Sequence, residues 1–322
     1  MKKFTVQNMR EVLCHIPEHD LPEKDFLCVK NAYNTCLTLL WIEEKFNILS
    51  QNYDEWEEEI KSSYDFFLRN QNSDPDCNHR QNQFGLKEII ILNRRLNNFL
   101  SSVRLYQDQV SHNLSSLEEI TSKTLLQNFK QKASALYDSS LSYQLMEFIR
   151  NYMQHQGLIV NKLTVIVPFS RKIDDCLPYF IEIDLNELRS VQKFNAKIKL
   201  KHELDGQCRW LNLIGIMREY YQHLSELHEE LRDITSAISD DAEQEINKFV
   251  KDYYNDFTIP SFAFESNEPT ESFLLQMPYL CLLKRRRAKS YMIKHAERKV
   301  FRYSEKIKAQ NAVRIEILYN QF

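Results

Sequence analysis

The chain has 322 residues, of which 43% are hydrophobic and 27% are charged. This length suits about one to three domains, and the composition is that of a protein with a packed core. Only 4 residues are glycine, so neither GxGxxG nor GxxxxGK[ST] can be written anywhere in the chain. The sequence therefore excludes phosphate-cradling P-loops, dinucleotide-binding turns and protein-kinase glycine loops.

The formal net charge of −3 is unevenly distributed along the chain. Residues 281–322 carry 12 Lys and Arg against 3 Asp and Glu, a balance of +9, and the first 280 residues carry 30 against 42, a balance of −12. This asymmetry suits a basic end that contacts an anion, either nucleic acid or an acidic partner. A solvated helix face that balances an acidic body explains it equally well.

The cysteines and the apolar stretches indicate a cytoplasmic protein. There are 7 cysteines, an odd number, and no CxxC pair, which is typical of reduced, buried thiols. The first residues contain two lysines but no apolar signal core. The most apolar stretch, at 36–42, is far shorter than the roughly 18 residues that a membrane span needs.

Apolar periodicity predicts several helices in the first half of the chain. The first covers 25–68, and a polar segment at 70–85 is expected to be a loop. A second helix of about 25 residues follows from apolar residues spaced alternately by three and four; these are Ile89, Leu92, Leu96, Phe99, Val103, Tyr106 and Val110.

A break is expected at 111–119, where Ser115 and Glu118 have the spacing of a capping box. The next helix then runs from about 120 to 156, and Gly157 stands where a left-handed residue commonly ends a helix. Its apolar stripe is Leu141, Leu145, Phe148 and Tyr152.

The second half begins with a change of pattern. Residues 163–170 and 177–185 are rich in β-branched and aromatic types and predict a small insert of two or three strands. A helical seam of nine apolar residues follows, which suits a bundle core or a coiled coil; its members are Trp210, Leu213, Met217, Tyr220, Leu224, Leu227, Leu231, Ile234 and Ile238. A further helix at 240–256, a linker at 260–269 and a basic helical end complete the chain.

These elements predict a mainly α fold, an elongated helical bundle with a β insert at about 160–200 and a basic helical C-terminal end. We divide the chain into an N-terminal helical region at 1–84, a helical bundle at 85–258 and a basic C-terminal region at 270–322.

Common metal and nucleophile motifs are absent from the sequence. His15 and His19 have helical spacing, but Pro17 between them disrupts the shared face that a metal pair needs. Cys77 and His79 lie in a polar segment without a second ligand pair nearby, and neither HExxH nor GxSxG occurs. We expect no metal and no cofactor.

The segment from Arg150 to His155, RNYMQH, combines a guanidinium with an imidazole. RNA can be cut without metal when a base removes the 2′-OH proton and a cation stabilises the phosphate as charge builds on it. A histidine titrates in the range that the first task needs, and an arginine grips phosphate oxygens as a fork. Asn151 would position the phosphate or support His155.

The Arg-x4-His spacing also occurs at Arg10/His15 and at Arg218/His223. In both of these copies Glu follows the arginine and would neutralise it locally, whereas an amide follows Arg150. Only the copy at 150–155 ends against a glycine.

The stretch FIRNYMQHQGL resembles the signature of the HEPN superfamily, in which Arg, a polar residue, a short spacer and His follow one another. The resemblance covers about 85–240, with the β insert and the basic end outside the shared pattern. It implies an all-α bundle that forms a homodimer with two motifs across one cleft. Active members of this superfamily are metal-independent endoribonucleases, often toxins or antiviral effectors, whereas others are inactive scaffolds or RNA binders.

Helix geometry limits how the motif can work in one chain. At 100° per residue, Arg150 lies about 180° from Leu141 and His155 lies about 40° from the apolar stripe, so the two side chains do not converge on a straight helix. A site shared between two chains, or a distorted last turn, would bring them together. Glu147, three residues before Arg150, can orient the guanidinium, and we place Glu147 and Tyr152 as supporting residues.

A second candidate for nucleic-acid binding is a cluster of cations with aromatic residues downstream, which suits a phosphate-binding surface with stacking platforms. Its members are Lys284, Arg285, Arg286, Arg287 and Lys289. A partner contact or a solvated helix face is the other explanation of this cluster.

The sequence thus predicts a metal-independent endoribonuclease that cleaves tRNA or mRNA by 2′-OH attack, with an antitoxin or other regulatory protein as a further partner. The alternative from another class is a non-catalytic scaffold of the same fold that binds RNA or protein. A regulatory nucleotide-binding domain is a third interpretation.

Overall fold

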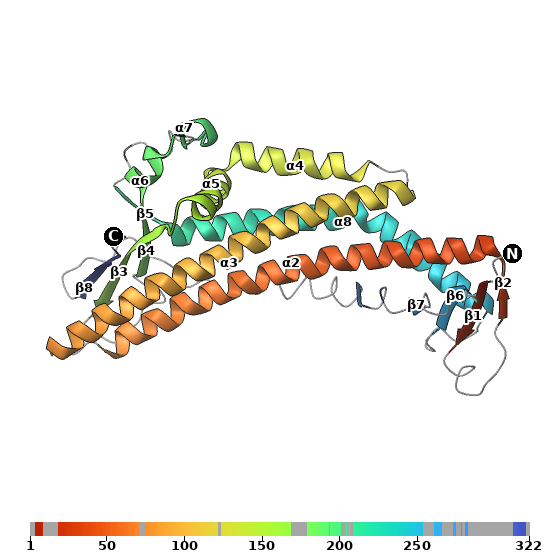
Figure 1. The fold of residues 1–322 in the computed structure, drawn as a ribbon, viewed down its shortest axis with the longest axis horizontal. Helices are drawn as coiled ribbons and strands as arrows, with labels where there is room; N and C mark the ends of the chain where they lie inside the picture. Colours follow the sequence, from red (N-terminus) through yellow and green to blue (C-terminus); the bar gives the residue numbers. More distant parts are fainter. Residues whose placement is uncertain are drawn as a thin grey trace. The chain divides into compact units, whose positions relative to one another are not determined.

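The computed structural model describes residues 4–8, 19–70, 75–121, 124–168, 179–192, 194–200, 204, 206, 209–253, 261–265, 273–274, 278, 281–282 and 312–319. The fold over these residues is mainly helical, with short antiparallel strands (Figure 1). The chain divides into two compact units. Unit 1 comprises Met1–Asn47, Tyr106–Phe129 and Glu229–Glu297, and unit 2 comprises Ile48–Leu105, Lys130–His228 and Arg298–Phe322.

The longest described helices are α2 (Glu23–Arg69), α3 (Pro75–Thr121) and α8 (Leu213–Tyr253). The predicted apolar stripe of α3 is fully buried, from Ile89 through Val110. The seam predicted from Trp210 to Ile238 is buried along α8 except at Ile234, which is half-buried, and Trp210, which belongs to a preceding strand. Helical periodicity therefore identified the core-facing sides of both helices correctly.

Of two predicted breaks in the helices, one is shorter than expected and the other is absent. Helix α2 ends at Arg69 and α3 begins at Pro75, a residue suited to the first helical position, so the loop predicted at 70–85 is wrong over 75–85. The expected break at 111–119 is also wrong, since α3 continues to Thr121. Its hydroxyl side chains donate hydrogen bonds to carbonyls one turn back, as from Ser115 to Ser111, and so remain compatible with a helix. Likewise, α8 runs through residues 240–253 without interruption.

The helix predicted over 120–156 is two helices, α4 (Leu125–Ser139) and α5 (Leu141–His155). Ser140 separates them with an extended backbone, and its side chain accepts a hydrogen bond from the Tyr143 backbone N–H as the N-cap of α5. Gly157 follows α5 with a φ of 155°, which is far from the left-handed helical value of about 57° that the sequence predicted.

The predicted β insert belongs to an antiparallel sheet in unit 2 with the order β5-β4-β3-β8. Its strands are β3 (Val160–Pro168), β4 (Tyr179–Asp184), β5 (Trp210–Asn212) and β8 (Ala312–Leu318). One sheet face buries apolar residues such as Leu163 and Ile181. The opposite face carries Lys162, which pairs with Glu182 at 3.4 Å and with Glu316 at 3.2 Å across the neighbouring strands.

The strand β8 corrects the expectation of a helical C-terminal end over Ala312–Leu318. It pairs antiparallel with β3, from Lys162 opposite Leu318 to Pro168 opposite Ala312. The sequence AVRIEIL alternates apolar and polar residues with the period of a strand, which the basic residues before it obscured. Residues 283–311, which hold most of the predicted basic helix, lie outside the described residues.

Unit 1 has its own sheet and core. The sheet has the order β2-β1-β6-β7, with β1 (Phe4–Asn8), β2 (His19–Leu21), β6 (Ser261–Glu265) and β7 (Phe273–Leu274). The predicted linker at 260–269 therefore contains a strand. The core of unit 1 joins residues of β1, β2, α2, α8 and β6, including Val6, Val29, Cys36, Ile246 and Ala263.

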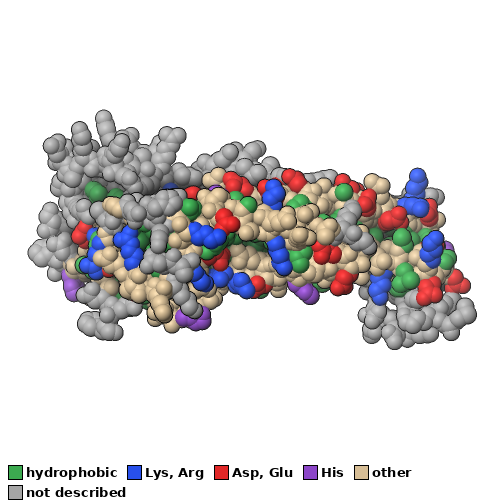
Figure 2. Space-filling model, turned by 90° about the horizontal axis from the view of Figure 1, so that it is seen from above, with side chains coloured by type: hydrophobic (Ala, Val, Ile, Leu, Met, Phe, Trp, Pro, Cys, Tyr) green, Lys and Arg blue, Asp and Glu red, His purple; other side chains and the backbone are tan. Residues whose placement is uncertain are grey.

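The described surface mixes charges of both signs. Figure 2 shows Lys and Arg side chains interspersed with Asp and Glu on the face in view. Within the described part of the chain, no helix combines the length and apolar character required to cross a bilayer.

Candidate functional site

The motif helix α5 is anchored along its length by buried side chains of unit 2. Residues from Ser142 to Met146, together with Phe148, Ile149 and Tyr152, are buried. The helix ends at His155, where the backbone N–H of Gln156 donates to the carbonyl of Tyr152. His155 and Gln156 are exposed, so the last turn of α5 presents these side chains to solvent.

The exposed end of α5 forms one wall of a pocket of about 610 Å³. This pocket, which we call the α5 pocket, is lined by Phe148, Asn151, Tyr152, His155, Gln156, Ser190, Val191, Gln192 and Lys197. The polar lining combines an imidazole and an ammonium with amides and a hydroxyl. No Asp or Glu is among the described residues of this lining.

The rest of the described lining comes from α6 (Leu185–Ser190), the turn after it, and α7 (Phe194–Lys197). Figure 1 shows α6 and α7 near α5. The Phe194 ring packs edge-on against Phe148 with centroids 5.2 Å apart. The buried amide of Gln144 accepts hydrogen bonds from the backbone N–H groups of Lys199 and Leu200, at 2.7 and 3.1 Å. These contacts fix the segment after α7 to α5.

Tyr152 ties α6 to α5 at the edge of the pocket. Its hydroxyl donates a hydrogen bond to Glu187, whose other carboxylate oxygen accepts one from Asn161 at 3.3 Å. Burial and the adjacent Glu187 carboxylate raise the pKa of the Tyr152 phenol. The Tyr152 phenol therefore stays neutral and donates its hydrogen bond. Tyr152 both joins α5 to α6 and lines the pocket.

Arg150 lies outside the α5 pocket lining. Its Nη1 is 2.9 Å from a carboxylate oxygen of Glu147, and its Nη2 donates to Asn151 Oδ1 at 3.3 Å. Glu147 also accepts a hydrogen bond from the buried Tyr220 hydroxyl at 2.7 Å. As helix geometry predicts, Arg150 and His155 do not converge within one chain, whereas Asn151 and His155 line the same pocket.

Asn93 holds the backbone that follows α5, although the sequence pattern did not single out this residue. Asn93 is fully buried on α3, and its Oδ1 accepts hydrogen bonds from the backbone N–H groups of Ile159 and Val160, each at 3.0 Å. Its Nδ2 donates to the carbonyls of Ile89 and Val160. One side chain thus satisfies the backbone where α5 gives way to β3.

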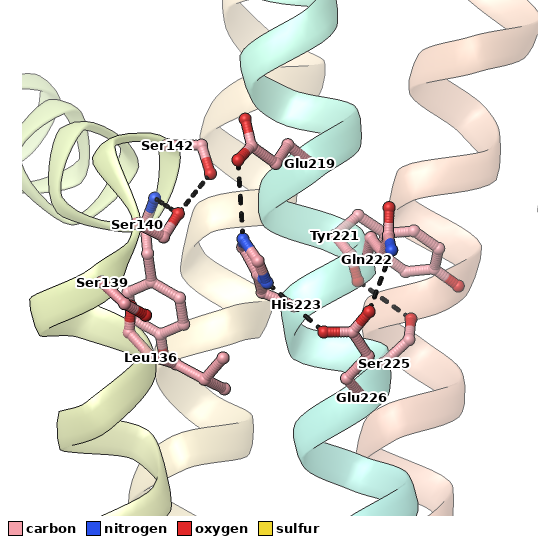
Figure 3. Close-up of polar contacts among 11 residues, drawn as sticks. Leu136, Ser139, Ser140, Ser142, Glu219, Tyr221, Gln222, His223, Ser225 and Glu226 are labelled. Atoms are coloured by element: carbon pink, nitrogen blue, oxygen red, sulfur yellow. Dashed lines mark hydrogen bonds and ion pairs between the residues drawn. The ribbon is translucent and has the colours of Figure 1, made fainter. Parts of the chain in front are cut away.

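The second Arg-x4-His copy is surrounded by carboxylates. Arg218 donates to both carboxylate oxygens of Glu57, at 2.8 and 2.7 Å. His223 lies on α8 with its ring nitrogens 3.6 Å from Glu219 and 3.4 Å from Glu226 (Figure 3). In Figure 3 the ring extends toward the segment of Ser140 and Ser142, and neither residue lines the α5 pocket.

Other sequence candidates lie outside the described residues. These are the Arg10/His15 copy and the cluster of Lys284, Arg285, Arg286, Arg287 and Lys289. Among the residues with described placement, no group of three or more His, Cys, Asp or Glu side chains is arranged to hold a metal ion.

Sequence reasoning missed the lining residues outside α5, above all Lys197 and Gln192. Both lie within the insert predicted at about 160–200, after its strand β4, and no motif or periodicity distinguishes them from other polar residues of that segment. Comparisons with models of protein families, with curated proteins and with solved structures found no match. The α5 pocket is therefore interpreted from its own geometry.

Proposed function

We propose that the α5 pocket is the active site of a metal-independent endoribonuclease, and that the chain acts as a homodimeric RNA-cleaving toxin or antiviral effector of HEPN type. The observation that carries the proposal is the exposed imidazole of His155 beside Asn151 and Lys197 in a pocket of about 610 Å³. A pocket of this size accommodates a nucleotide. Its polar groups suit a phosphodiester with an adjacent hydroxyl.

The proposed reaction is an internal transfer of the phosphoryl group. His155 removes the proton from the 2′-OH, the 2′-oxygen bonds to phosphorus, and the bond from phosphorus to the 5′-oxygen breaks. A protonated His155 of a second copy gives the leaving oxygen its proton. The products are a 2′,3′-cyclic phosphate and a 5′-hydroxyl, so atoms and charge balance without water or an added cofactor.

Arg150 acts in this proposal as a positioning residue. Because its guanidinium occupies Asn151 Oδ1, the amide N–H groups of Asn151 remain to donate to a phosphate oxygen. Glu147 in turn fixes the guanidinium through a 2.9 Å ion pair. The sequence predicted that Arg150 itself contacts the phosphate. Its ion pair with Glu147 favours instead an indirect role within one chain, in which Arg150 positions Asn151.

The test compares two histidines that share the Arg-x4-His spacing. His155→Ala is expected to lower the cleavage rate of single-stranded RNA by about 10²–10⁴-fold, the usual contribution of a general acid or base. His223→Ala is the matched control and should cleave as the wild type does, since His223 lies outside the pocket. Thermal unfolding of each variant checks its fold. Equal cleavage by the wild type and His155→Ala would refute the proposal.

The engagement of Arg150 also favours a second candidate, a non-catalytic RNA-binding scaffold. A guanidinium held by Glu147 does not contact a phosphate in this arrangement. This candidate expects the purified protein to retain RNA without forming cleavage products, an outcome that the same assay detects.

A further inference from the structure

Among its described lining residues, the α5 pocket carries positive charge without a compensating carboxylate. Lys197 is exposed, and neither Asp nor Glu is among the described residues that line the pocket with it. The neighbouring lysine differs, because Lys199 Nζ lies 2.6 Å from Asp138 and Lys199 does not line the pocket. Of these two lysines, Lys197 is the one that faces the pocket with its charge available.

The Glu187 carboxylate on α6 already has hydrogen-bond partners. Both oxygens of Glu187 accept hydrogen bonds, one from the Tyr152 hydroxyl and one from Asn161. These bonds hold the carboxylate beside Tyr152 at the pocket edge, and Glu187 is not among the described residues that line the pocket. The pocket therefore favours an anion over a cation.

The backbone at Lys197 is held in place on both sides. The Lys197 carbonyl accepts a hydrogen bond from the Tyr137 hydroxyl at 2.9 Å, and Phe194 in the same short helix packs against Phe148. The bonds from Lys199 and Leu200 to Gln144 fix the following residues. These contacts hold the backbone of Lys197 in a defined position relative to His155 on α5.

We infer that Lys197 is the phosphate-binding cation of the α5 pocket, and that its ligand is a phosphodiester of single-stranded RNA. The inference rests on the proposed function and replaces Arg150 as the charged contact to phosphate. The amides of Asn151, Gln156 and Gln192 line the same pocket and offer both donors and acceptors to an unstacked base. Bases are available to such groups in single strands and not within an RNA helix.

The experiment separates binding from cleavage. Binding of a short fluorescein-labelled single-stranded RNA is measured by anisotropy at several salt concentrations, in the full chain with His155→Ala to prevent cleavage. Adding Lys197→Ala should weaken binding about 10-fold and reduce the slope of log affinity against log salt by about 0.7, the loss of one phosphate contact. Lys197→Arg should retain most of the affinity, and the matched control Lys199→Ala should leave both quantities unchanged.

Binding by Lys197→Ala that equals binding by Lys199→Ala, at every salt concentration, would overturn the inference. Cleavage by chains that retain His155 distinguishes this failure from failure of the proposed function. If cleavage depends on His155 but not on Lys197, the function stands and the inference fails. If no chain cleaves RNA but Lys197→Ala still weakens binding, the inference stands and the pocket binds RNA without cutting it. Absence of RNA binding by the His155→Ala chain, together with absence of cleavage by the wild type, would overturn both.

Discussion

At the scale of single residues, Glu88 is the buried acid with the clearest consequence for stability. Its side chain on α3 is 1% exposed, and Oε1 has no hydrogen-bond partner among the described residues. Burial, and secondarily repulsion from Glu59, raise the pKa of Glu88 to about 8, although a hydrogen bond with Ser63 acts in the opposite direction. The folded protein therefore holds this proton at pH values where the unfolded chain releases it.

This raised pKa predicts a loss of stability with rising pH. The contribution of Glu88 is fully present below its ordinary pKa of 4.5 and is lost as the pH rises to about 8. Glu88→Gln should remove this dependence, with little effect near pH 4 and a gain of up to about 5 kcal/mol in the free energy of unfolding above pH 8. Urea unfolding across this pH range measures it, with the exposed Glu58→Gln as control. Parallel pH profiles for the wild type and Glu88→Gln would contradict the prediction.

At the scale of elements, Gly85 allows β8 to pack against α3. A Cβ added at Gly85 would overlap the Ile317 side chain, chiefly at its Cδ1 atom. Ile317 lies on β8 and is 3% exposed. A glycine in the middle of a helix ordinarily costs about 1 kcal/mol of stability relative to alanine. Here the missing side chain leaves room for Ile317 of β8, a strand from the other end of the chain.

Gly85→Ala should lower the free energy of unfolding by about 1–3 kcal/mol, because overpacking outweighs the gain in helix propensity. Ile317→Val removes the overlapping Cδ1 atom. The two substitutions should therefore be coupled, with the double variant more stable than the sum of the single effects by about 1 kcal/mol or more. Denaturant unfolding of all four proteins completes the cycle, and strictly additive effects would contradict the packing described.

The elements also show which features a sequence can predict. The burial of α3 and α8 followed from apolar spacing, since a helix that packs on a core needs apolar residues every three or four positions. The loop expected at 70–85 was wrong from Pro75 onward, and the break expected at 111–119 was wrong. Pro75 is compatible with a helix start, and Ser115 satisfies its hydroxyl within the helix. Polar composition alone does not distinguish such segments from loops.

The candidate site was predictable only where its residues are close in sequence. The pairing of Glu147 with Arg150 at i and i+3, and the divergence of Arg150 from His155, follow from helix geometry. The placement of Lys197 does not, because it depends on hydrogen bonds that Gln144 Oε1 accepts from backbone N–H groups 55 and 56 residues away. The role of Arg150 in phosphate contact stays a prediction.

At the scale of the whole molecule, each unit contains an arginine of α8 that forms a two-pronged ion pair with a glutamate of α2. Arg218 binds Glu57 within unit 2, at 2.8 and 2.7 Å, and Arg232 binds Glu43 within unit 1, at 2.9 and 2.5 Å. The second pair is nearly inaccessible, with side-chain exposures of 6% and 3%. Breaking a buried pair by removing one partner is strongly destabilising, so these arginines serve the fold.

His155 differs from these structural groups because its imidazole is exposed in a pocket. The central claim of this account is that this imidazole moves the 2′-OH proton of bound RNA. It is tested most directly by the chemical ends of RNA incubated with the purified full chain in EDTA, identified by mass spectrometry. The account predicts 2′,3′-cyclic phosphate and 5′-hydroxyl ends with the wild type, and intact RNA with His155→Ala. Fragments with 3′-hydroxyl and 5′-phosphate ends, or RNA left intact by the wild type, would contradict it.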